Sequence, residues 1–569
     1  MLRHLLILFF IFPLFSPQCF SQNIENNSKL REIIRQYGQA EVIIPYSDRI
    51  SADILSQNVS IVSVINNSIY IKLSPLTAEW FIQQKFNYLI VERIENKGVI
   101  SAQNLIKALD WETYPTYSQY DSIMHSFSNT YPDLCHLDTI GTSVNGKLVL
   151  AIKISDNAAI EEGEPETFYS STIHGDETGG FVLMLRLIDY LLKNYNLNSR
   201  VKNLVDNMEI WINPLANPDG TYNSGNTIIS PTRFNANGYD LNRNFPDPAK
   251  PYSDNYVMQK ETHDMVKFMR EHKFVISANF HSGVEVVNYP WDKWFSKFHA
   301  DDSWFYSISR AYADTAHAYS GPAYMNYLDN GVTRGADWYI INGGRQDFIT
   351  WELQGREVTI ELDDQYVTPA AQLPLLWMYN WHSLIGYLEN ALYGIHGLVR
   401  NKSTEEPVPA KVYIAGHDKD NSHVYSDTLS GSFIRLIEPG QWSLTFTANG
   451  YFDTTISNID VFPEQRTDII VDMRAVTNHI GKTFSKAVLL YPNPAENVIG
   501  VELPDEITGN VNVRIINQLG MLLTDYTTET FHGNPLTIDV SWLPAGTYFI
   551  FFKNIFTGFS SHGRFVVIK

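Results

Sequence analysis

A histidine and a glutamate three residues apart, His174 and Glu177, stand in the stretch STIHGDETGG. This stretch follows an apolar, β-prone run at 168–173 and precedes a helical-looking run at 181–192. A loop between a strand and a helix can aim both side chains at one point. Catalytic zinc takes three ligands of the His/Glu type and leaves a fourth position for water. We therefore expect His174, Glu177 and a distant third residue, His281, to hold a metal ion.

The H-x-x-E spacing is a weak signal alone, because it arises by chance in many chains. A surface loop pair and a capped buried histidine are the alternative reading at this point. Five further stretches follow: NPLANPDG (213–220), TRFNANGYDLNRNFPD (232–247), ANFHSGVEVVNYPWD (278–292), WYIINGGRQDF (338–348) and EVTIELDD (357–364). In this order and spacing they resemble the zinc metallocarboxypeptidases, and within them the subfamily of carboxypeptidases N, E and D, which remove C-terminal Lys or Arg.

The resemblance implies a role for each reacting group. His174 and Glu177 match the H-x-x-E zinc ligands, and His281 matches the third ligand. Glu361, in T-I-E-L, matches the general base, and Arg233 matches the arginine that polarises the scissile carbonyl. These residue types suit amide hydrolysis. Zinc makes water nucleophilic near neutral pH, a carboxylate moves its proton, and a cation stabilises charge on the carbonyl oxygen.

The resemblance also implies the substrate-binding groups. Asn242 and Arg243 match the residues that grip the terminal carboxylate, and Tyr339 matches the mobile tyrosine that closes on the substrate. Asp292, in NYPWD, matches the aspartate that selects Lys or Arg, and Gln346 matches the second residue of that pocket. A guanidinium and an amide donor fit a free carboxylate. A buried carboxylate would be left unpaired by an apolar side chain and so disfavours one.

Three positions depart from the subfamily pattern. HGDE stands where HGNE is common, HSG where HGG is, and GGRQD where GGMQD is. Asp176 and Ser282 are not ligands, so both changes should be tolerated. Arg345 adds a positive charge beside Gln346, and it weakens selection for basic residues if it points into the pocket.

The elements that position these residues alternate between strand and helix over 109–394. Strand candidates are 148–154, 168–173, 208–213, 274–280 and 357–362, and helix candidates include 181–195, 263–272 and 373–392. The alternation indicates an α/β sheet with helices on both faces. Ligands bind at the carboxyl ends of the strands in such folds. The resemblance implies the carboxypeptidase fold, a mixed twisted sheet flanked by helices, over 109–394.

The N-terminal part is predicted to contain a leader and a small unit. Residues 1–21 have the pattern of a secretory signal peptide, with cleavage near Ser21. A membrane anchor and a lipidated Cys19 are the alternatives, but the apolar run 5–15 is shorter than the ~20 residues of a span. Residues 22–108 alternate strand-like and helical runs, which predicts a small α/β unit. It is either a propeptide or a structural domain.

Two small β-sandwich domains are predicted after the α/β part. Residues 395–475 hold short strands separated by turns. They resemble the transthyretin-like domain that follows the catalytic domain in this subfamily. After a polar link at 477–486, residues 487–569 resemble the C-terminal sorting domain of proteins exported by the type IX system of Bacteroidetes. An ordinary binding β-domain is the alternative.

The amino-acid composition limits the classes of molecule that the protein is expected to bind. A formal net charge of −20 argues against nucleic acid and anionic membranes and favours a cationic substrate. No membrane span is expected in the mature chain. Of the two cysteines, Cys19 and Cys135, cleavage would remove the first, which leaves no internal disulfide.

Together these features predict a secreted zinc carboxypeptidase of a Gram-negative bacterium, outside the cell or at its surface. Its expected cofactor is one zinc ion, its substrates are basic C-termini of peptides or proteins, and its partner is the outer-membrane secretion machinery. Two alternatives are a zinc amidase acting on peptidoglycan stem peptides and a catalytically inactive binding or adhesion protein. The complete set of ligands and base argues against the inactive protein.

Overall fold

The computed structural model consists of two compact units, residues 1–475 and 476–569. It describes residues 17–46, 54–92, 98–249, 257–321, 323–476 and 488–569, the last without 505, 506, 508, 532 and 556–558. The apolar run of the predicted signal peptide and the link 477–486 lie outside these residues. Within them, no helix combines the length and apolarity needed to cross a bilayer.

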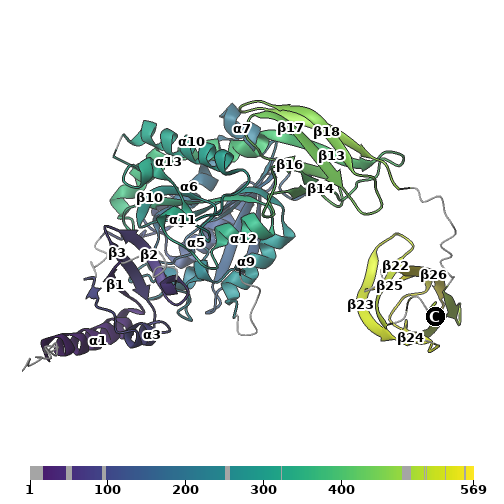
Figure 1. Cartoon of the computed structure of the whole chain (residues 1–569), viewed down its shortest axis with the longest axis horizontal. Coiled ribbons are helices and arrows are strands. Elements are labelled where there is room, and N and C mark those ends of the chain that lie inside the picture. Colours follow the sequence, from purple (N-terminus) through teal and green to yellow (C-terminus); the bar gives the residue numbers. More distant parts are fainter. Residues whose placement is uncertain are drawn as a thin grey trace, which may run out of the picture. The chain divides into compact units, whose positions relative to one another are not determined.

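Residues 17–92 form an α/β module, here called the N-terminal module (Figure 1). Its elements are α1 (Pro17–Tyr37), β1 (Ala40–Pro45), β2 (Ser60–Ile65), β3 (Ser68–Leu73), α3 (Ala78–Gln83) and β4 (Leu89–Ile90). The strands pair in the order β2-β3-β1-β4, all antiparallel. Their apolar side chains form a separate core, and Tyr339 and Ile341 from the neighbouring part of the chain pack into it.

A mixed sheet forms the centre of the first unit, in the order β11-β10-β12-β9-β7-β8-β6-β5 among the described strands. The strands are β5 (Cys135–Thr142), β6 (Leu148–Ile154), β7 (Glu166–Ser171), β8 (Glu209–Asn213), β9 (Phe274–His281), β10 (Val284–Tyr289), β11 (Val332–Arg334) and β12 (Arg356–Asp363). Strands β8, β7, β9 and β12 run parallel, whereas β10 is antiparallel to β12, and β6 to β8. The predicted mixed α/β sheet is confirmed.

Helices cover both faces of this sheet (Figure 1). They are α4 (Leu105–Ala108), α5 (Tyr117–Thr130), α6 (Gly179–Asn194), α7 (Ser199–Val205), α8 (Pro218–Thr221), α9 (Lys260–Glu271), α10 (Asp302–Ser320), α11 (Gly335–Trp338), α12 (Arg345–Glu352) and α13 (Leu373–Glu389), with 3₁₀ turns η1 (Leu241–Arg243), η2 (Asp329–Gly331), η3 (Ala370–Gln372) and η4 (Asn390–Leu392). Side chains of successive strand residues point to opposite faces. Accordingly Tyr169 belongs to the core that contains side chains of α5, α6, α10 and α13, whereas Phe168 belongs to the core that contains side chains of α9 and α12.

The core of the α/β part starts earlier than the predicted boundary at residue 108. Ala102 and Ala108 are buried in the same core as the central sheet. The carbonyl of Gly98 accepts a hydrogen bond from the amide of Ala370 at 2.9 Å. Among the described residues, Ile90 packs on the core of the N-terminal module and Val99 packs on the core of the central sheet. Residue periodicity predicts which face is buried, but it does not say against which core.

Two small β-sandwiches complete the chain. The first has sheets β16-β13-β19 and β15-β14-β17-β18, and the second, in the other unit, has β20-β21-β24 and β23-β22-β25-β26. Their strands are β13 (Gly394–Asn401), β14 (Lys411–Tyr413), β15 (Val424–Tyr425), β16 (Ser432–Arg435), β17 (Gly440–Thr447), β18 (Thr454–Val461), β19 (Arg466–Met473), β20 (Leu489–Tyr491), β21 (Val498–Glu502), β22 (Gly509–Asn517), β23 (Leu522–Thr530), β24 (Leu536–Asp539), β25 (Gly546–Asn554) and β26 (Ser560–Val567). Each has its own apolar core, as the sequence predicts.

Candidate active site

Three parallel strands, β7, β9 and β12, bring the predicted metal ligands and base to one edge of the central sheet. His174 lies in the loop after β7, and His281 is the last residue of β9. Glu361 on β12 is the register partner of His281. The carboxyl ends of neighbouring parallel strands meet at the same edge of a sheet. His174 and Glu361, which are 187 positions apart in the chain, therefore lie at the same edge.

The three predicted ligands form a tight buried cluster. The Nδ1 atom of His174 lies 2.8 Å from Oε1 of Glu177, and Nδ1 of His281 lies 2.7 Å from Oε2 of the same carboxylate. The two Nδ1 atoms are 3.0 Å apart. Each of the three residues is 3% exposed or less, so water does not separate them. The predicted convergence on one point is therefore present.

Hydrogen bonds on the outer side of each imidazole indicate which ring nitrogen carries the proton. Nε2 of His174 lies 3.0 Å from Oδ1 of Asp240, which only accepts, so this Nε2 donates. Nε2 of His281 lies 2.8 Å from the amide of Asn279, whose Oδ1 has no partner among the described residues. With that amide turned by 180°, Oδ1 accepts from Nε2 of His281 and Nδ2 takes the position that has no partner among the described residues. Both Nδ1 atoms then present lone pairs inward.

This arrangement fits a divalent cation. Two imidazole lone pairs and the Glu177 carboxylate are all acceptors. Arg233 reaches Nδ1 of His174 and Oε1 of Glu177, whereas Nδ1 of His281 faces Oε2 of Glu177 at 2.7 Å, where a metal ion would relieve the repulsion. Two imidazoles and one carboxylate are a donor set of catalytic zinc. Burial lowers the pKa of His281 to about 4, which keeps its imidazole neutral.

An arginine and an aspartate extend the cluster. Nη1 of Arg233 lies 3.0 Å from both Oε1 of Glu177 and Nδ1 of His174, and its Nε donates to Asp240 at 2.9 Å. Asp240 thus orients a candidate ligand and a candidate catalytic cation at once. Asp240 is not among the site residues predicted from the sequence. The signal for its role was its place in the 232–247 motif, between the two arginines.

Glu361, on β12, is the predicted general base at this edge of the central sheet. Its side chain is 9% exposed, and its Oε2 has no hydrogen-bond partner among the described residues. Burial, and next the charge of Glu177, raise the pKa of Glu361 well above its usual value. A carboxyl group in this state can accept or hold a proton beside the cluster.

The predicted carboxylate-binding residues lie on η1. Arg243 donates through Nη1 to the carbonyl of Asn242 and through Nη2 to the carbonyl of Ile61, each at 2.9 Å. Asn242 accepts at Oδ1 from the amide of Arg345 at 2.9 Å, at the start of α12. Tyr339 follows α11 and is 8% exposed, and burial raises its pKa to about 12. Its phenol is therefore neutral at physiological pH.

The predicted specificity residues, Asp292 and Gln346, contact each other. Nε2 of Gln346 donates to Oδ1 of Asp292 at 3.0 Å and lies 3.3 Å from Oδ1 of Asn288. Burial raises the pKa of Asp292 to about 7. A Cβ on Gly335 would lie 1.8 Å from the Asp292 carboxylate, so only glycine leaves room there. The sequence analysis did not select Asn288 or Gly335.

A cavity of about 20 Å³ lies at the centre of these residues. Eight of the ten predicted site residues line it: His174, Glu177, Arg233, Asn242, Arg243, His281, Tyr339 and Glu361. Asp292 and Gln346 contact it through Asn288, which is in its wall. Val62 of the N-terminal module also lines the cavity. The ten residues predicted from motifs far apart in the chain thus form one site.

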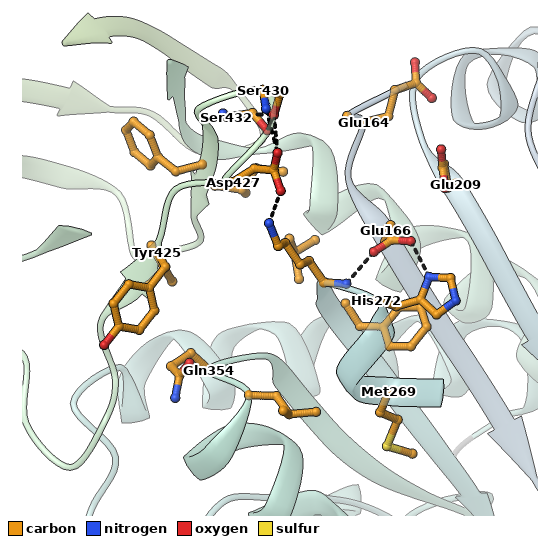
Figure 2. A pocket seen from close by; sticks show the side chains of 18 of the residues that line it. Glu164, Glu166, Glu209, Met269, His272, Gln354, Tyr425, Asp427, Ser430 and Ser432 are labelled. Atoms are coloured by element: carbon orange, nitrogen blue, oxygen red, sulfur yellow. Dashed lines mark hydrogen bonds and ion pairs between the residues drawn. The ribbon is translucent and has the colours of Figure 1, made fainter. Parts of the chain in front are cut away.

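A larger cavity, of about 530 Å³, lies between the central sheet and the first β-sandwich (Figure 2). Its charged groups largely pair with one another. Glu166 is 2.6 Å from Nδ1 of His272, and Asp427 accepts a hydrogen bond from Lys273. None of the ten predicted residues is among those lining it. Its size alone therefore does not make it the reaction site.

Comparison with known proteins gives two family matches. Residues 120–383 match the model described as zinc carboxypeptidase, and residues 489–566 match the secretion system C-terminal sorting domain. The chain is 34% identical over 383 residues to human (Homo sapiens) carboxypeptidase D, covering 64% of this chain and 27% of that protein. It therefore spans less than a third of that relative.

Two further similarities involve shorter proteins. The catalytic chain of human (Homo sapiens) carboxypeptidase N is 31% identical over 393 residues, which cover 62% of this chain and 84% of that one. Among solved structures, a carboxypeptidase A from Helicoverpa armigera covers 62% of this chain and 97% of its own, with 15% identity and a TM-score of 0.48.

Proposed function

The chain belongs to the zinc carboxypeptidase family, and from this premise we propose that it is an exported enzyme that releases C-terminal Lys or Arg from peptides or proteins. The observation that carries the proposal is the pairing of His281 with Glu361 across β9 and β12. It sets an acid with a free oxygen beside three converging metal-ligand side chains.

His174, Glu177 and His281 would hold the zinc ion. When bound there, zinc supplies a Lewis acid at the point where these side chains converge. Glu361 takes a proton from the attacking water and passes it to the leaving amine, since its Oε2 has no hydrogen-bond partner in the described part of the chain and its pKa is raised. Arg233, held by Asp240, offers a fixed positive charge to the developing oxyanion.

Recognition of a chain end is assigned to Arg243 and Asn242. Their side chains line the cavity beside Glu361. A guanidinium in this position gains a charge-assisted hydrogen bond from a terminal carboxylate and much less from an internal amide. This difference supports an exopeptidase rather than an endopeptidase.

Preference for Lys or Arg is assigned to Asp292. Its carboxylate has Gln346 and Asn288 as neutral neighbours, so a substrate cation would be its counter-charge. Arg345 does not oppose this preference, because Nη2 of its guanidinium donates to Glu357 at 3.0 Å and the group lies over the ring of Phe168. The positive charge of Arg345, which departs from the subfamily pattern, is thus neutralised by Glu357 inside the core.

A peptide assay tests the proposal. The zinc-loaded chain is incubated with peptides ending in Arg, in Leu and in Arg amide, with Glu361→Gln as the blank. We expect release of free Arg from the first peptide, little from the second and none from the third. Release that continues with a chelator, or in the Glu361→Gln blank, would refute the proposal. Cleavage of muropeptides in place of these peptides would favour the peptidoglycan amidase.

Export is assigned to the two ends of the chain. The match of residues 489–566 to a sorting domain supports passage through the type IX system, after the N-terminal signal has directed the chain across the inner membrane. The sorting domain is a compact unit of its own, so it can be deleted without cutting another core. We expect deletion of residues 487–569 to leave the enzyme in the periplasm. Its appearance outside the cell after deletion would contradict this route.

A further inference from the structure

Asp347, on α12, holds the backbone of the predicted specificity residue Asp292. Its Oδ1 accepts a hydrogen bond from the amide of Asp292 at 3.0 Å, and its Oδ2 accepts from the amide of Lys293 at 2.8 Å. The side chain of Asp347 is buried, with 2% of the residue exposed. Both oxygens of one buried carboxyl group are thus used on two successive residues of another segment.

The segment that Asp347 holds lies beyond the sheet. Asp292 comes three residues after Tyr289, the last residue of β10, and belongs to none of the described strands. A buried amide N–H group needs an acceptor, and a loop has no strand ladder to provide one. Asp347 supplies that acceptor, and the carbonyl of Asp292 in turn accepts from the amide of Ile341 at 3.1 Å. The backbone of Asp292 is therefore placed by Asp347 and Ile341 rather than by the sheet.

The first turn of α12 contacts both groups proposed to recognise a C-terminal residue. The amide of Arg345 donates to Oδ1 of Asn242 at 2.9 Å. Nε2 of Gln346 donates to Oδ1 of Asp292 at 3.0 Å, and Asp347 accepts from the backbone of the same residue. Three successive residues of one turn thus link the carboxylate-binding Asn242 to the side chain and the backbone of Asp292.

Helix α12 is itself fixed at both ends. Near its start, Nη2 of Arg345 lies 3.0 Å from Oε2 of Glu357 on β12, and both side chains are fully buried. Near its end, the ring of Trp351 packs edge-on against Trp291, with ring centroids 5.7 Å apart. A group held by packing and buried polar contacts keeps its geometry more accurately than one on a free loop. Asp347 is therefore a rigid support for the segment at 292–293.

Asp347 has no cation of its own among the described residues. The ammonium group of the neighbouring Lys293 hydrogen-bonds to Asn342 and lies 3.4 Å from Asp247. Burial, and next the charge of Asp292, raise the pKa of Asp347 well above its usual value. A substrate cation paired with Asp292 would reduce the repulsion between the two carboxyl groups. The charge of Asp347 thus favours the same side chains that Asp292 is proposed to select.

From these contacts we propose that Asp347 is a positioning residue for the selection of Lys or Arg. Through the amides of residues 292 and 293, it holds the Asp292 carboxyl group where a substrate cation reaches it. The proposal rests on the assignment of Asp292 as the group that selects basic side chains. Asp347 is not among the residues that line the central cavity, so it contacts no reacting group. Its loss should weaken binding of a basic C-terminal residue and leave the hydrolytic step unchanged.

The test compares four zinc-loaded full-length proteins: parent, Asp347→Asn, Asp292→Asn and Glu352→Gln. Asp347→Asn keeps the size of the side chain but replaces one accepting oxygen by an NH₂ group, which opposes the backbone amide it faces. Glu352→Gln makes the same acid-to-amide change at an exposed position of the same helix. The constants kcat and KM are measured with peptides ending in Arg and in Leu.

We expect Asp347→Asn to raise KM for the Arg peptide by about tenfold, because a displaced Asp292 loses a charge-assisted contact with the substrate. Its kcat for that peptide, and both constants for the Leu peptide, should stay near the parent values. Glu352→Gln should resemble the parent with both peptides. A smaller folded fraction lowers kcat equally for the two peptides and leaves both KM values unchanged, so poor folding does not imitate the expected result.

An equal change for both peptides, or no change for either, in Asp347→Asn would overturn the proposal. If the preference for Arg is lost in Asp292→Asn and kept in Asp347→Asn, only the role of Asp347 fails. If Asp292→Asn also keeps the preference, the proposed specificity fails with it, so the two failures are distinguishable.

Deuterium exchange gives a readout that does not depend on hydrolysis. Peptic fragments that contain residues 292 and 293 are analysed by mass spectrometry in the same four proteins. The amides of Asp292 and Lys293 should exchange faster in Asp347→Asn than in the parent, Asp292→Asn or Glu352→Gln, because only this variant loses their acceptor. Equal exchange in all four proteins would overturn the proposal.

Discussion

His281 and Glu361 are register partners on the parallel strands β9 and β12, which places the last predicted metal ligand beside an acid whose Oε2 is free among the described residues. Backbone hydrogen bonds of the sheet, rather than a loop conformation, set this spacing. A site on regular elements holds its geometry more accurately than one on loops. The spacing between the predicted ligand His281 and the predicted base Glu361 is therefore built into the sheet.

Replacing Glu361 by Gln should remove catalysis and keep the metal. The amide has the same shape but does not take up a proton, so kcat should fall by ~10²–10⁴ with little change in KM. Zinc content, measured by atomic absorption, should stay at the parent value, because none of the three ligand side chains changes. A variant that keeps most of its kcat would show that another group is the base.

Removing zinc should lower the stability of the chain as well as its activity. Without a metal ion, Nδ1 of His281 faces Nδ1 of His174 at 3.0 Å and Oε2 of Glu177 at 2.7 Å, and Arg233 compensates only His174 and the other oxygen of Glu177. A metal that binds the folded state alone raises the melting temperature by mass action. Calorimetry should show a lower Tm after chelation that zinc restores. His174→Gln should show no such zinc-dependent rise, and a rise as large as the parent's would contradict the assigned ligand set.

Arg243→Met should abolish discrimination between a free and a blocked C-terminus. A hydrogen bond to a charged group contributes ~1.5–3 kcal/mol, so the kcat/KM ratio of acid to amide peptide should drop by about 10- to 100-fold. The amide peptide serves as internal control, since its kcat/KM should change little. An unchanged ratio would show that another cation binds the carboxylate.

Preference for Arg over Leu should strengthen as pH rises through about 7. The pKa of Asp292 is raised to about 7 by burial, so the carboxyl is neutral below this pH and charged above it. Only the charged form attracts a substrate guanidinium. The ratio of kcat/KM for Arg- and Leu-ending peptides should therefore increase with pH in the parent. It should stay flat in Asp292→Asn, and a parallel increase in this variant would contradict the assignment.

The raised pKa of Asp292 also makes the free energy of unfolding depend on pH. A carboxyl whose pKa is higher in the folded state binds a proton on folding, and that stabilisation is lost as pH rises from its ordinary value of 3.8 toward about 7. The advantage of Asp292→Asn in free energy of unfolding should therefore grow across this range. Urea unfolding of both proteins at several pH values measures it, and a constant difference would argue against the raised pKa.

Much of the site was predictable because its residues occur in short motifs with fixed spacing. Motif matching places His174, Arg233 and Glu361 by position in the chain, and strand alternation predicts the sheet that brings them together. Strand ends differ by one or two residues, as for β7, which is Glu166–Ser171 rather than 168–173. The reason is that hydrogen bonding to β8 and β9, not local apolarity, decides where the strand begins and ends.

What the sequence did not reveal depends on contacts between distant segments. Asp240 is important because it reaches both His174 and Arg233, and Asn288 because it separates the cavity from Asp292. Lys72 looks like any strand lysine until its partner Asp176 is known. No local pattern encodes these partners. The departure at Asp176 was visible in the sequence, but its reason was not.

The most direct measurement of the central claim uses mass spectrometry on one peptide in two forms, ending in free Arg or in Arg amide. The zinc-loaded parent protein is compared with its Glu361→Gln variant. We predict loss of a single Arg from the free-acid peptide, and no product from the amide or with Glu361→Gln. Cleavage within the peptide, equal cleavage of the amide, or the same products with Glu361→Gln would contradict the account.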